Sequence, residues 1–170
     1  MKHSPSVLIV GAGPTGLMMA CELARHGISF RIIDKKSERT PTSNAAIIHT
    51  RSLELLDHIG IVDRFLALGV HCKAFRIHGS KGQELAQIPC DQNNSHYLFS
   101  LFLPQSETEN ILNKRLEELL NPVERPLELI DVKQENQKII CTIKKADEQI
   151  ETVETDWLIG CDGYHSYVRE

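Results

Sequence analysis

The sequence predicts an α/β fold: a parallel β-sheet with a helical crossover, an antiparallel β-hairpin, and part of a second β-sheet. The first observation is the apolar, β-branched run Val7–Val10, which is typical of a parallel strand buried on both faces. The second is the helical spacing of apolar residues within Pro14–His26, a segment that is stopped by Gly27. The third is the strand pattern of Phe30–Ile33. Together these segments predict a βαβ unit, whose crossover is right-handed in nearly all known cases.

The rest of the chain is predicted to contain both helices and strands. Apolar residues at helical spacing, bounded by turn residues, predict helices over Ser52–Ile59, Ile61–Leu68 and Ser106–Leu120. Strand patterns cover Ala74–His78, Glu84–Ile88, Tyr97–Leu103, Leu127–Val132, Lys138–Lys144, Ile150–Glu154 and Trp157–Gly160. Of these, Lys138–Lys144 and Ile150–Glu154 alternate as the strands of a half-exposed antiparallel hairpin should.

Composition and charge restrict the class of protein. Hydrophobic residues make up 41% and charged residues 25% of the 170 residues, close to the averages of globular proteins. The net charge is −4 with the two signs interspersed, so we expect no nucleic-acid partner. No apolar run is long enough to cross a bilayer and no signal-peptide core is seen, so we expect no membrane span and a cytoplasmic location. The five cysteines are widely spaced and the eight histidines form no ligand pattern, which predicts free thiols and no metal site.

A glycine-rich turn directly follows the first predicted strand. It reads Gly-x-Gly-x-x-Gly, and its glycines are Gly11, Gly13 and Gly16. Pro14 and Thr15 stand between the last two, at the start of the predicted helix. In this motif the first glycine permits a tight turn, the second lets the backbone approach a pyrophosphate, and the third allows the helix to pack closely. Because the helix N-terminus also offers free N–H groups to an anion, the turn predicts a Rossmann-like, FAD- or NAD(P)-binding site.

An acidic residue ends the second predicted strand. Asp34 follows Gly16 by 18 positions, close to where a dinucleotide site needs a carboxylate for the ribose hydroxyls. Lys35 and Lys36 leave NADP open as an alternative, because a cation can accommodate a 2′-phosphate. About ninety residues separate Asp34 from Leu127–Val132, whereas an NAD-binding half would soon reach a third parallel strand. This arrangement favours FAD.

The segment Trp157–Arg169 carries a second motif. It reads WLIGCDGYHSYVR, in which an apolar strand is followed by Asp162 and Gly163, and then by Ser166 and Arg169, which we expect to open a helix. An Asp-Gly pair at the carboxyl end of a strand places a carboxylate and a permissive backbone where α/β sheets bind ligands. The segment resembles a fingerprint of the FAD-dependent aromatic hydroxylases of the para-hydroxybenzoate hydroxylase type. The resemblance implies that it contacts FAD and takes part in NAD(P)H binding.

Further stretches are similar to the same family, so the resemblance covers essentially the whole chain. RSLELLDHIGI, at Arg51–Ile61, is similar to the family's helix after the ribose-binding acid. LPQSETENIL, at Leu103–Leu112, is similar to the stretch in which a Gln contacts the flavin. The resemblance therefore implies Gln105 as a FAD ligand. It also implies that the backbone of Val132 meets the adenine side.

The sequence departs from the family at Asn44, where many relatives carry a basic residue that contacts the pyrophosphate. An amide can form a hydrogen bond but cannot neutralise charge. Arg51 is a candidate replacement, although an arginine on an amphipathic helix is as often simply exposed. The predicted cofactor-binding residues are therefore Gly11, Gly13, Pro14, Thr15, Gly16, Asp34, Lys35, Asn44, Gln105, Val132, Asp162 and Gly163.

For an intact protein, the resemblance implies a flavoprotein monooxygenase. NADH or NADPH would reduce FAD, and oxygen from O₂ would pass to a small aromatic substrate, with the cofactor carrying the hard chemistry. No residue of this chain is predicted to be catalytic. The alternatives are a non-catalytic FAD- or nucleotide-binding fragment, or a related flavoenzyme: an epoxidase, a ubiquinone-pathway hydroxylase or a geranylgeranyl reductase.

Members of this family continue for about as long again, or more, after the second fingerprint. We therefore expect the chain that stops at Glu170 to be an N-terminal portion, inactive alone, whose partner is the missing C-terminal half of the same enzyme. We expect a FAD-binding βαβ and helices over residues 1–70, partial substrate-domain strands over 71–104, and the remainder of the FAD-binding domain over 105–170.

Overall fold

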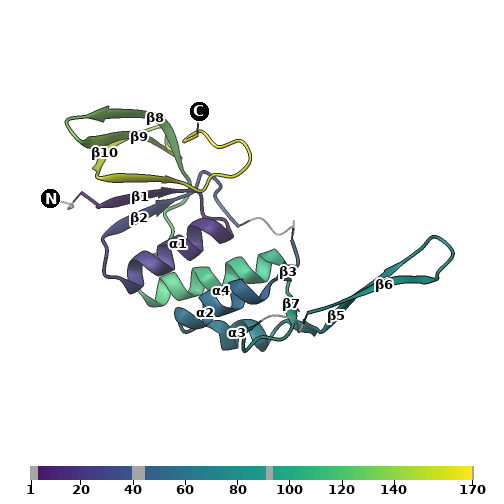
Figure 1. Cartoon of the computed structure of the whole chain (residues 1–170). Coiled ribbons are helices and arrows are strands. Elements are labelled where there is room, and N and C mark those ends of the chain that lie inside the picture. The colour runs from purple at the N-terminus through teal and green to yellow at the C-terminus, as the bar shows by residue number, and fades with distance from the viewer. Residues whose placement is uncertain (1–3, 40–44, 91–93, 170) are drawn as a thin grey trace. The chain divides into compact units, whose positions relative to one another are not determined.

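The computed structural model of the chain describes residues 4–39, 45–90 and 94–169 (Figure 1). The chain divides into two compact units. Unit 1 comprises Met1–Pro41 and Glu109–Glu170, and unit 2 comprises Thr42–Thr108. Among the described residues, no helix is both long and apolar enough to span a membrane.

Unit 1 is built on the predicted βαβ unit, which is confirmed. Strands β1 (Val7–Val10) and β2 (Phe30–Ile33) pair in parallel, and helix α1 (Pro14–Arg25) connects them. Strand β11 (Trp157–Gly160) pairs in parallel on the other side of β1, so that the order is β11-β1-β2. A single parallel bridge from Ile33 to Glu124 extends the sheet beyond β2. The carboxyl ends of β1, β2 and β11 therefore meet at one edge of the sheet.

A three-stranded antiparallel sheet covers one face of this parallel sheet. It consists of β8 (Leu127–Glu135), β9 (Lys138–Lys145) and β10 (Ile150–Thr155), in the order β10-β9-β8. The predicted hairpin thus gains a third strand. The connection from β8 to β9 passes through Asn136 and Gln137, both at positive φ, which is the geometry of a two-residue type I′ hairpin turn.

The core of unit 1 explains why β1 is apolar at every position. Leu8 and Val10 pack in one cluster with residues of the antiparallel sheet, namely Leu129, Cys141, Ile143 and Val153. Ile9 is also fully buried, and strand alternation turns it to the opposite face, on which α1 lies (Figure 1). A strand covered on both faces has no solvent-facing position, so no polar residue interrupts it.

Helix α4 (Gln105–Glu118) begins in unit 2 and enters unit 1 at Glu109. Its buried residues within unit 1 include Ile111, Leu112 and Leu116, as the predicted apolar stripe requires. The Cys21 thiol on α1 contacts the Leu112 carbonyl oxygen at 4.0 Å, so this part of α4 packs beside α1.

In the residues that the structure describes, unit 2 contains two short helices and two small antiparallel sheets besides the first turn of α4. Helices α2 (Thr50–His58) and α3 (Val62–Leu66) bury Leu53, Leu56 and Phe65. One sheet has the order β3-β7-β4, with β3 (Ile47–Ile48), β7 (Ser100–Phe102) and β4 (Val70–Cys72). The other is the hairpin of β5 (Ala74–His78) and β6 (Glu84–Pro89), which has a register shift between Ile77 and His78. Strands β3 and β4 were not predicted, and the predicted strand Tyr97–Leu103 is shorter than expected.

A partly buried ion network joins three segments of unit 1. The guanidinium of Arg31 on β2 contacts both carboxylate oxygens of Glu124, at 2.6 and 2.7 Å, and one carboxylate oxygen of Glu151 on β10, at 2.8 Å. The Arg31 side chain is only 16% exposed. The hydrogen bond from Arg31 lowers the pKa of Glu151, against the opposing effect of burial. Arg31 therefore holds together the parallel sheet, the edge bridge and the antiparallel sheet.

Replacing Arg31 by methionine is expected to destabilise the chain by about 2 kcal/mol at pH 7, because two carboxylates lose a partly buried partner. The pKa of Glu151 is lower in the folded chain than in the unfolded chain, so this stabilisation is present above about pH 4 and is lost as the pH falls. Urea unfolding of both proteins between pH 3 and pH 8 measures the difference, which should shrink at the acid end. Lys138→Met is the control, since Lys138 also contacts two carboxylates but at the surface, and it should change little. An equal effect of both substitutions at every pH would contradict the prediction.

Candidate cofactor-binding site

The glycine-rich turn lies between β1 and α1, at the carboxyl edge of the parallel sheet. Gly11 has φ +98°, and a Cβ atom there would overlap the carbonyl oxygen of Cys161. A Cβ atom on Gly16 would overlap the carbonyl oxygen of Gly11. Gly13 differs, because a Cβ atom there would meet no described atom within 4 Å. Two glycines are thus required by packing within the protein, and the third faces open space.

The first turn of α1 borders this open space. Gly13 is the N-cap residue of α1 and has no side chain that could cap the helix. Its carbonyl oxygen accepts the Leu17 N–H at 3.0 Å. The next residue, Pro14, has no N–H to satisfy. The N–H groups of Thr15 and Gly16 belong to the first turn, where a helix offers no acceptor of its own. These groups, together with the positive end of the helix dipole, form an environment suited to an anion.

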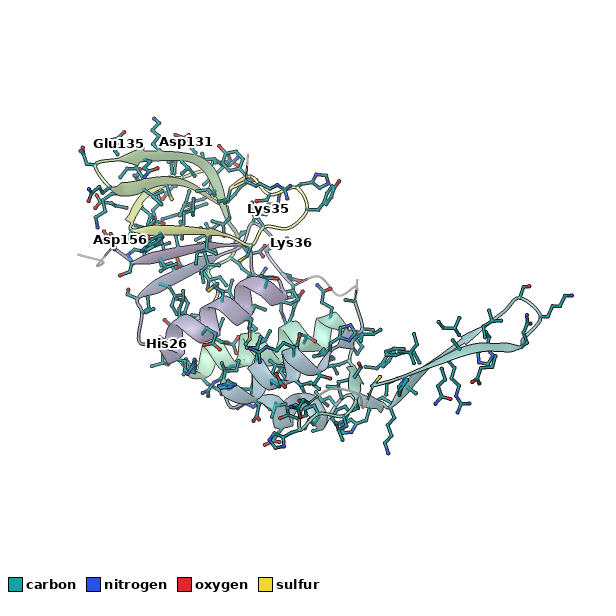
Figure 2. The ribbon with its side chains drawn as sticks, viewed as in Figure 1. His26, Lys35, Lys36, Asp131, Glu135 and Asp156 are labelled. Carbon is teal, nitrogen blue, oxygen red and sulfur yellow. The ribbon has the colours of Figure 1, made fainter. Side chains whose placement is uncertain are left out.

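Asp34 follows β2 at the same edge of the sheet, and its carboxylate is held from three sides. Oδ2 accepts the Ala12 N–H at 2.8 Å, and Oδ1 accepts the Lys36 N–H at 2.9 Å. A guanidinium nitrogen of Arg125 lies 3.4 Å from Oδ1. The first of these bonds ties the acidic residue to the glycine-rich turn, so the two predicted features form one site. Lys35 and Lys36 lie in the loop after β2 (Figure 2), and both are exposed.

Arg125 is the residue of this site that the sequence did not reveal. Its guanidinium also reaches the carbonyl oxygen of Ala12 at 3.4 Å and that of Lys36 at 3.5 Å. Its side chain is 13% exposed and that of Asp34 is 14% exposed. One arginine therefore contacts the turn, the acid and the loop after the acid. No local pattern marks it, because it lies 91 positions after Asp34.

Asp162 and Gly163 follow β11 at the same edge. Oδ2 of Asp162 accepts the N–H groups of Tyr167 at 2.7 Å and Val168 at 3.3 Å, while Gly163 takes φ +91°. Burial acts to raise the pKa of Asp162, but hydrogen bonds from Ser166 and from backbone N–H groups lower it on balance, so the carboxylate is ionised. Its Oδ1 is buried and has no hydrogen-bond partner among the described residues. A buried acceptor without a donor is costly and rare in native proteins.

Residues 164–169 form turns and the described residues end at Arg169, so the helix expected to open at Ser166 remains a prediction. Ser166 Oγ accepts the N–H of Arg169 at 3.2 Å, which is the bond that an N-cap serine makes to the third residue of a helix. Asp162 accepts the N–H groups of Tyr167 and Val168, which the first turn of a helix would leave without acceptors of its own.

Comparison with known proteins agrees with this geometry. The model of one protein family, described as FAD binding domain, matches residues 4–170. The chain belongs to this FAD binding domain family. The prediction of FAD as the cofactor and the resemblance to FAD-dependent aromatic hydroxylases are therefore confirmed.

Relatives of this FAD binding domain include named monooxygenases. Pentachlorophenol 4-monooxygenase of Sphingobium chlorophenolicum is 36% identical to this chain. The match covers 97% of this chain and 31% of that protein. 6-Methylpretetramide 4-monooxygenase of Streptomyces rimosus is also 36% identical, and the match covers 98% of this chain and 30% of that protein. The chain thus spans about a third of the length of these curated relatives.

Solved structures share the fold. An anhydrotetracycline hydroxylase from Streptomyces rimosus matches with a TM-score of 0.86 and 32% identity, covering 97% of this chain and 33% of that one. A p-nitrophenol 4-monooxygenase from Pseudomonas putida matches with a TM-score of 0.92, covering 99% of this chain and 43% of that one. Its identity is 22%, so it supports the fold alone.

Gln105, Val132 and Asn44 complete the predicted set of cofactor ligands. Gln105 belongs to unit 2, where its N–H donates to the Ala45 carbonyl oxygen at 2.9 Å. Val132 lies within β8 and lines a cavity of about 220 Å³ with Leu158, Tyr167 and Val168. Asn44 lies outside the described residues. Their contacts with the cofactor remain predictions.

Proposed function

We propose that unit 1 binds the adenosine and pyrophosphate parts of FAD at the carboxyl edge of its parallel sheet. The observation that carries this proposal is the contrast among the three glycines. Gly11 and Gly16 lack side chains because protein atoms fill the space, whereas Gly13 lacks one beside space that no described atom fills. A pyrophosphate at Gly13 would meet the N-terminus of α1, where Thr15 and Gly16 offer N–H groups.

Two carboxylates would bind hydroxyl groups of the same cofactor. Asp34 is fixed beside the turn, and each of its oxygens can accept a further hydrogen bond from a ribose hydroxyl. The buried Oδ1 of Asp162 needs a donor, which a cofactor hydroxyl would supply. The rest of the proposed set is Pro14, Lys35, Asn44, Gln105, Val132 and Gly163. FAD, when bound, supplies the redox chemistry, and these residues position it.

We further propose that a protein built on this chain is a cytoplasmic, FAD-dependent monooxygenase of small aromatic compounds that uses NADH or NADPH and O₂. The names of the relatives support this reaction class. The chain alone is expected to hydroxylate nothing, because it matches only a third of those proteins. Apolar side chains on the β5–β6 hairpin agree with a need for further chain, since Ile77 and Leu85 are 47% and 62% exposed.

A chimera tests the monooxygenase proposal. Residues 1–170 would replace the matching part of the pentachlorophenol 4-monooxygenase relative, whose remaining two thirds are retained. The chimera should retain FAD and oxidise NADPH or NADH faster when a phenol is added, with formation of a hydroxylated product. A chimera that holds FAD but shows no phenol-dependent oxidation would overturn the monooxygenase proposal. One that is folded and never retains FAD would overturn the proposed cofactor site.

A further inference from the structure

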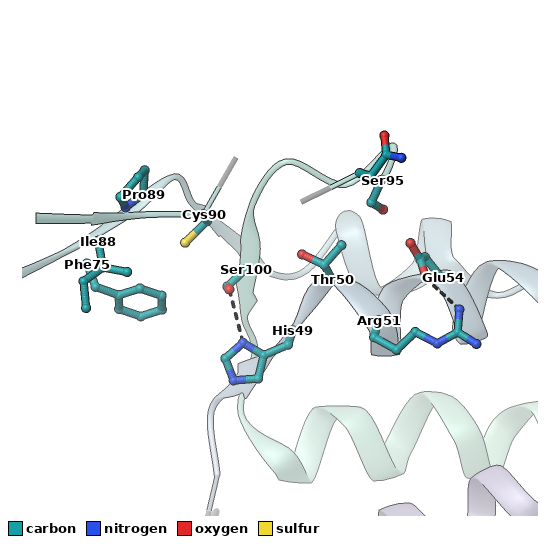
Figure 3. A pocket seen from close by; sticks show the side chains of 11 residues that line it. His49, Thr50, Arg51, Glu54, Phe75, Ile88, Pro89, Cys90, Ser95 and Ser100 are labelled. Atoms are coloured by element: carbon teal, nitrogen blue, oxygen red, sulfur yellow. Dashed lines mark hydrogen bonds and ion pairs between the residues drawn. The ribbon is translucent and has the colours of Figure 1, made fainter. Parts of the chain in front are cut away.

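Unit 2 contains a cavity of about 500 Å³ that lies apart from the glycine-rich turn in the sequence (Figure 3). Its walls come from the start of α2, from the β5–β6 hairpin and from the segment that leads into β7. The volume lies within the range of small-molecule sites, which are mostly apolar with a few placed polar groups. Of the described residues that line it, Arg51 alone was considered from the sequence as a candidate contact of the pyrophosphate.

One wall of the cavity is apolar and the opposite side is polar. Phe75, Ile88 and Pro89 lie on one side of a hydrogen-bonded pair formed by His49 and Ser100 (Figure 3). A flat ring suits such a wall, because aromatic and aliphatic side chains stack on or pack against its faces. The Phe75 ring is itself supported by Phe102, with ring centroids 6.0 Å apart.

The His49–Ser100 pair leaves one ring nitrogen for a ligand. Ser100 is buried, at 4% exposure, and its hydroxyl lies 3.4 Å from Nδ1 of His49. His49 is exposed, and no described residue forms a hydrogen bond to its Nε2. Its side chain does not cap α2, although His49 is the N-cap residue. Thr50 is already engaged, because its hydroxyl donates to the Tyr97 carbonyl oxygen at 3.2 Å. Nε2 of His49 is therefore a free hydrogen-bonding group of the cavity, whose described lining also includes the side chain of Asn94.

The fixed charges of the cavity cancel each other. Among its described lining residues, Arg51 and Glu54 carry permanent charge, and they form an ion pair at 2.8 Å. Glu54 also accepts a hydrogen bond from Ser95. An anionic ligand would have to compete with Glu54 for Arg51, so the cavity favours an uncharged ligand.

We propose that this cavity binds the ring of an uncharged phenol, with the ring against Phe75, Ile88 and Pro89 and its hydroxyl hydrogen-bonded to Nε2 of His49. Ser100 acts as a positioning residue that fixes the imidazole through Nδ1. The proposal rests on the proposed monooxygenase function, for which it would place an aromatic substrate in unit 2. It also specifies a preference for phenols over benzoates.

Amide NMR spectra of the ¹⁵N-labelled chain, titrated with three probes, test this site. 4-Ethylphenol should shift the amide signals of His49, Phe75 and Ile88 in a saturable way. 4-Ethylanisole, which lacks the hydroxyl hydrogen, should bind roughly fivefold more weakly, as expected for one lost hydrogen bond. 4-Ethylbenzoate should bind more weakly still. Benzoate binding as tight as phenol binding would overturn the claim of an uncharged ligand.

Two variants on neighbouring positions of β6 separate the cavity from the rest of the hairpin. Ile88→Trp should weaken 4-ethylphenol binding by roughly tenfold or more, because the indole fills the cavity. Gln87→Trp should leave it unchanged, because adjacent strand residues point to opposite faces. Equal effects of the two substitutions would overturn the assignment of the cavity.

Two further variants test the roles of His49 and Ser100. His49→Phe keeps a ring but should abolish the preference for 4-ethylphenol over 4-ethylanisole, and Ser100→Ala should reduce that preference without abolishing 4-ethylphenol binding. An undiminished preference in both variants would overturn the roles given to these residues. ADP added to the same samples reports on the proposed cofactor site of unit 1. Loss of phenol binding with ADP binding retained would count against the cavity alone. Loss of ADP binding with phenol binding retained would count against the cofactor site alone.

Discussion

Gly13→Asp is expected to raise the stability of the chain slightly and to abolish its binding of ADP. Gly13 is the N-cap residue of α1, with φ −76° and ψ −175°, a conformation that aspartate adopts without strain. Aspartate is among the best N-cap residues, so the free energy of unfolding should rise by about 0.3 kcal/mol. The same carboxylate would occupy and charge the space proposed for the pyrophosphate. Calorimetric titration with ADP should show at least a tenfold loss of affinity.

Gly16→Ala is the matched substitution for Gly13→Asp, and it is expected to lower the stability of the chain. Its Cβ atom would overlap the backbone oxygen of Gly11, and backbone atoms cannot move aside as a flexible side chain can. We expect a loss of about 3 kcal/mol or more in urea unfolding experiments. If Gly16→Ala were harmless, or if Gly13→Asp bound ADP as the unaltered chain does, the division of roles among the three glycines would be wrong.

Asp34→Ala is expected to lower both stability and ADP affinity. The substitution removes the acceptor of two backbone N–H groups, from Ala12 and Lys36, and leaves the Arg125 guanidinium partly buried without its acid. We expect the free energy of unfolding to fall by about 2 kcal/mol. ADP affinity should fall by at least tenfold, because the ribose hydroxyls lose their acceptor and the turn loses its tie to β2.

Asp34→Asn and Arg125→Met are the controls for this prediction. Asparagine keeps an oxygen for only one of the two N–H groups, so it should retain part of the stability that alanine loses. Arg125→Met should weaken ADP binding less than Asp34→Ala does, because Asp34 keeps both of its backbone donors. ADP affinity within twofold of the unaltered chain for Asp34→Ala would show that Asp34 does not bind the ribose. These affinities come from the same calorimetric titrations.

Local patterns in the sequence were sufficient to predict the parallel part of the fold. Val7–Val10 is apolar because both faces of β1 are covered, and that cause leaves a direct mark on composition. Strands β3 and β4 are two and three residues long, too short to show a period. Their pairing with β7 comes from tertiary contacts that no window of sequence contains.

The residues of the candidate site also fall into those that a local pattern predicts and those that it does not. The glycines and Asp34 were predicted because a motif places them at fixed spacing along one βαβ unit. Arg125 was not, because its contacts with Ala12, Asp34 and Lys36 arise only when the chain returns to the edge of β2 at Glu124. Long-range partners of this kind are not contained in any local sequence pattern.

The most direct test of the account is a comparison of ADP, FAD and FMN binding to the 170-residue chain by calorimetry. We predict that ADP and FAD bind with similar affinity, with a Kd on the order of 0.1 to 1 mM, and that FMN does not bind. This result follows if unit 1 holds the adenosine and pyrophosphate parts of FAD. Binding of FMN as tight as that of FAD, with no binding of ADP, would contradict it.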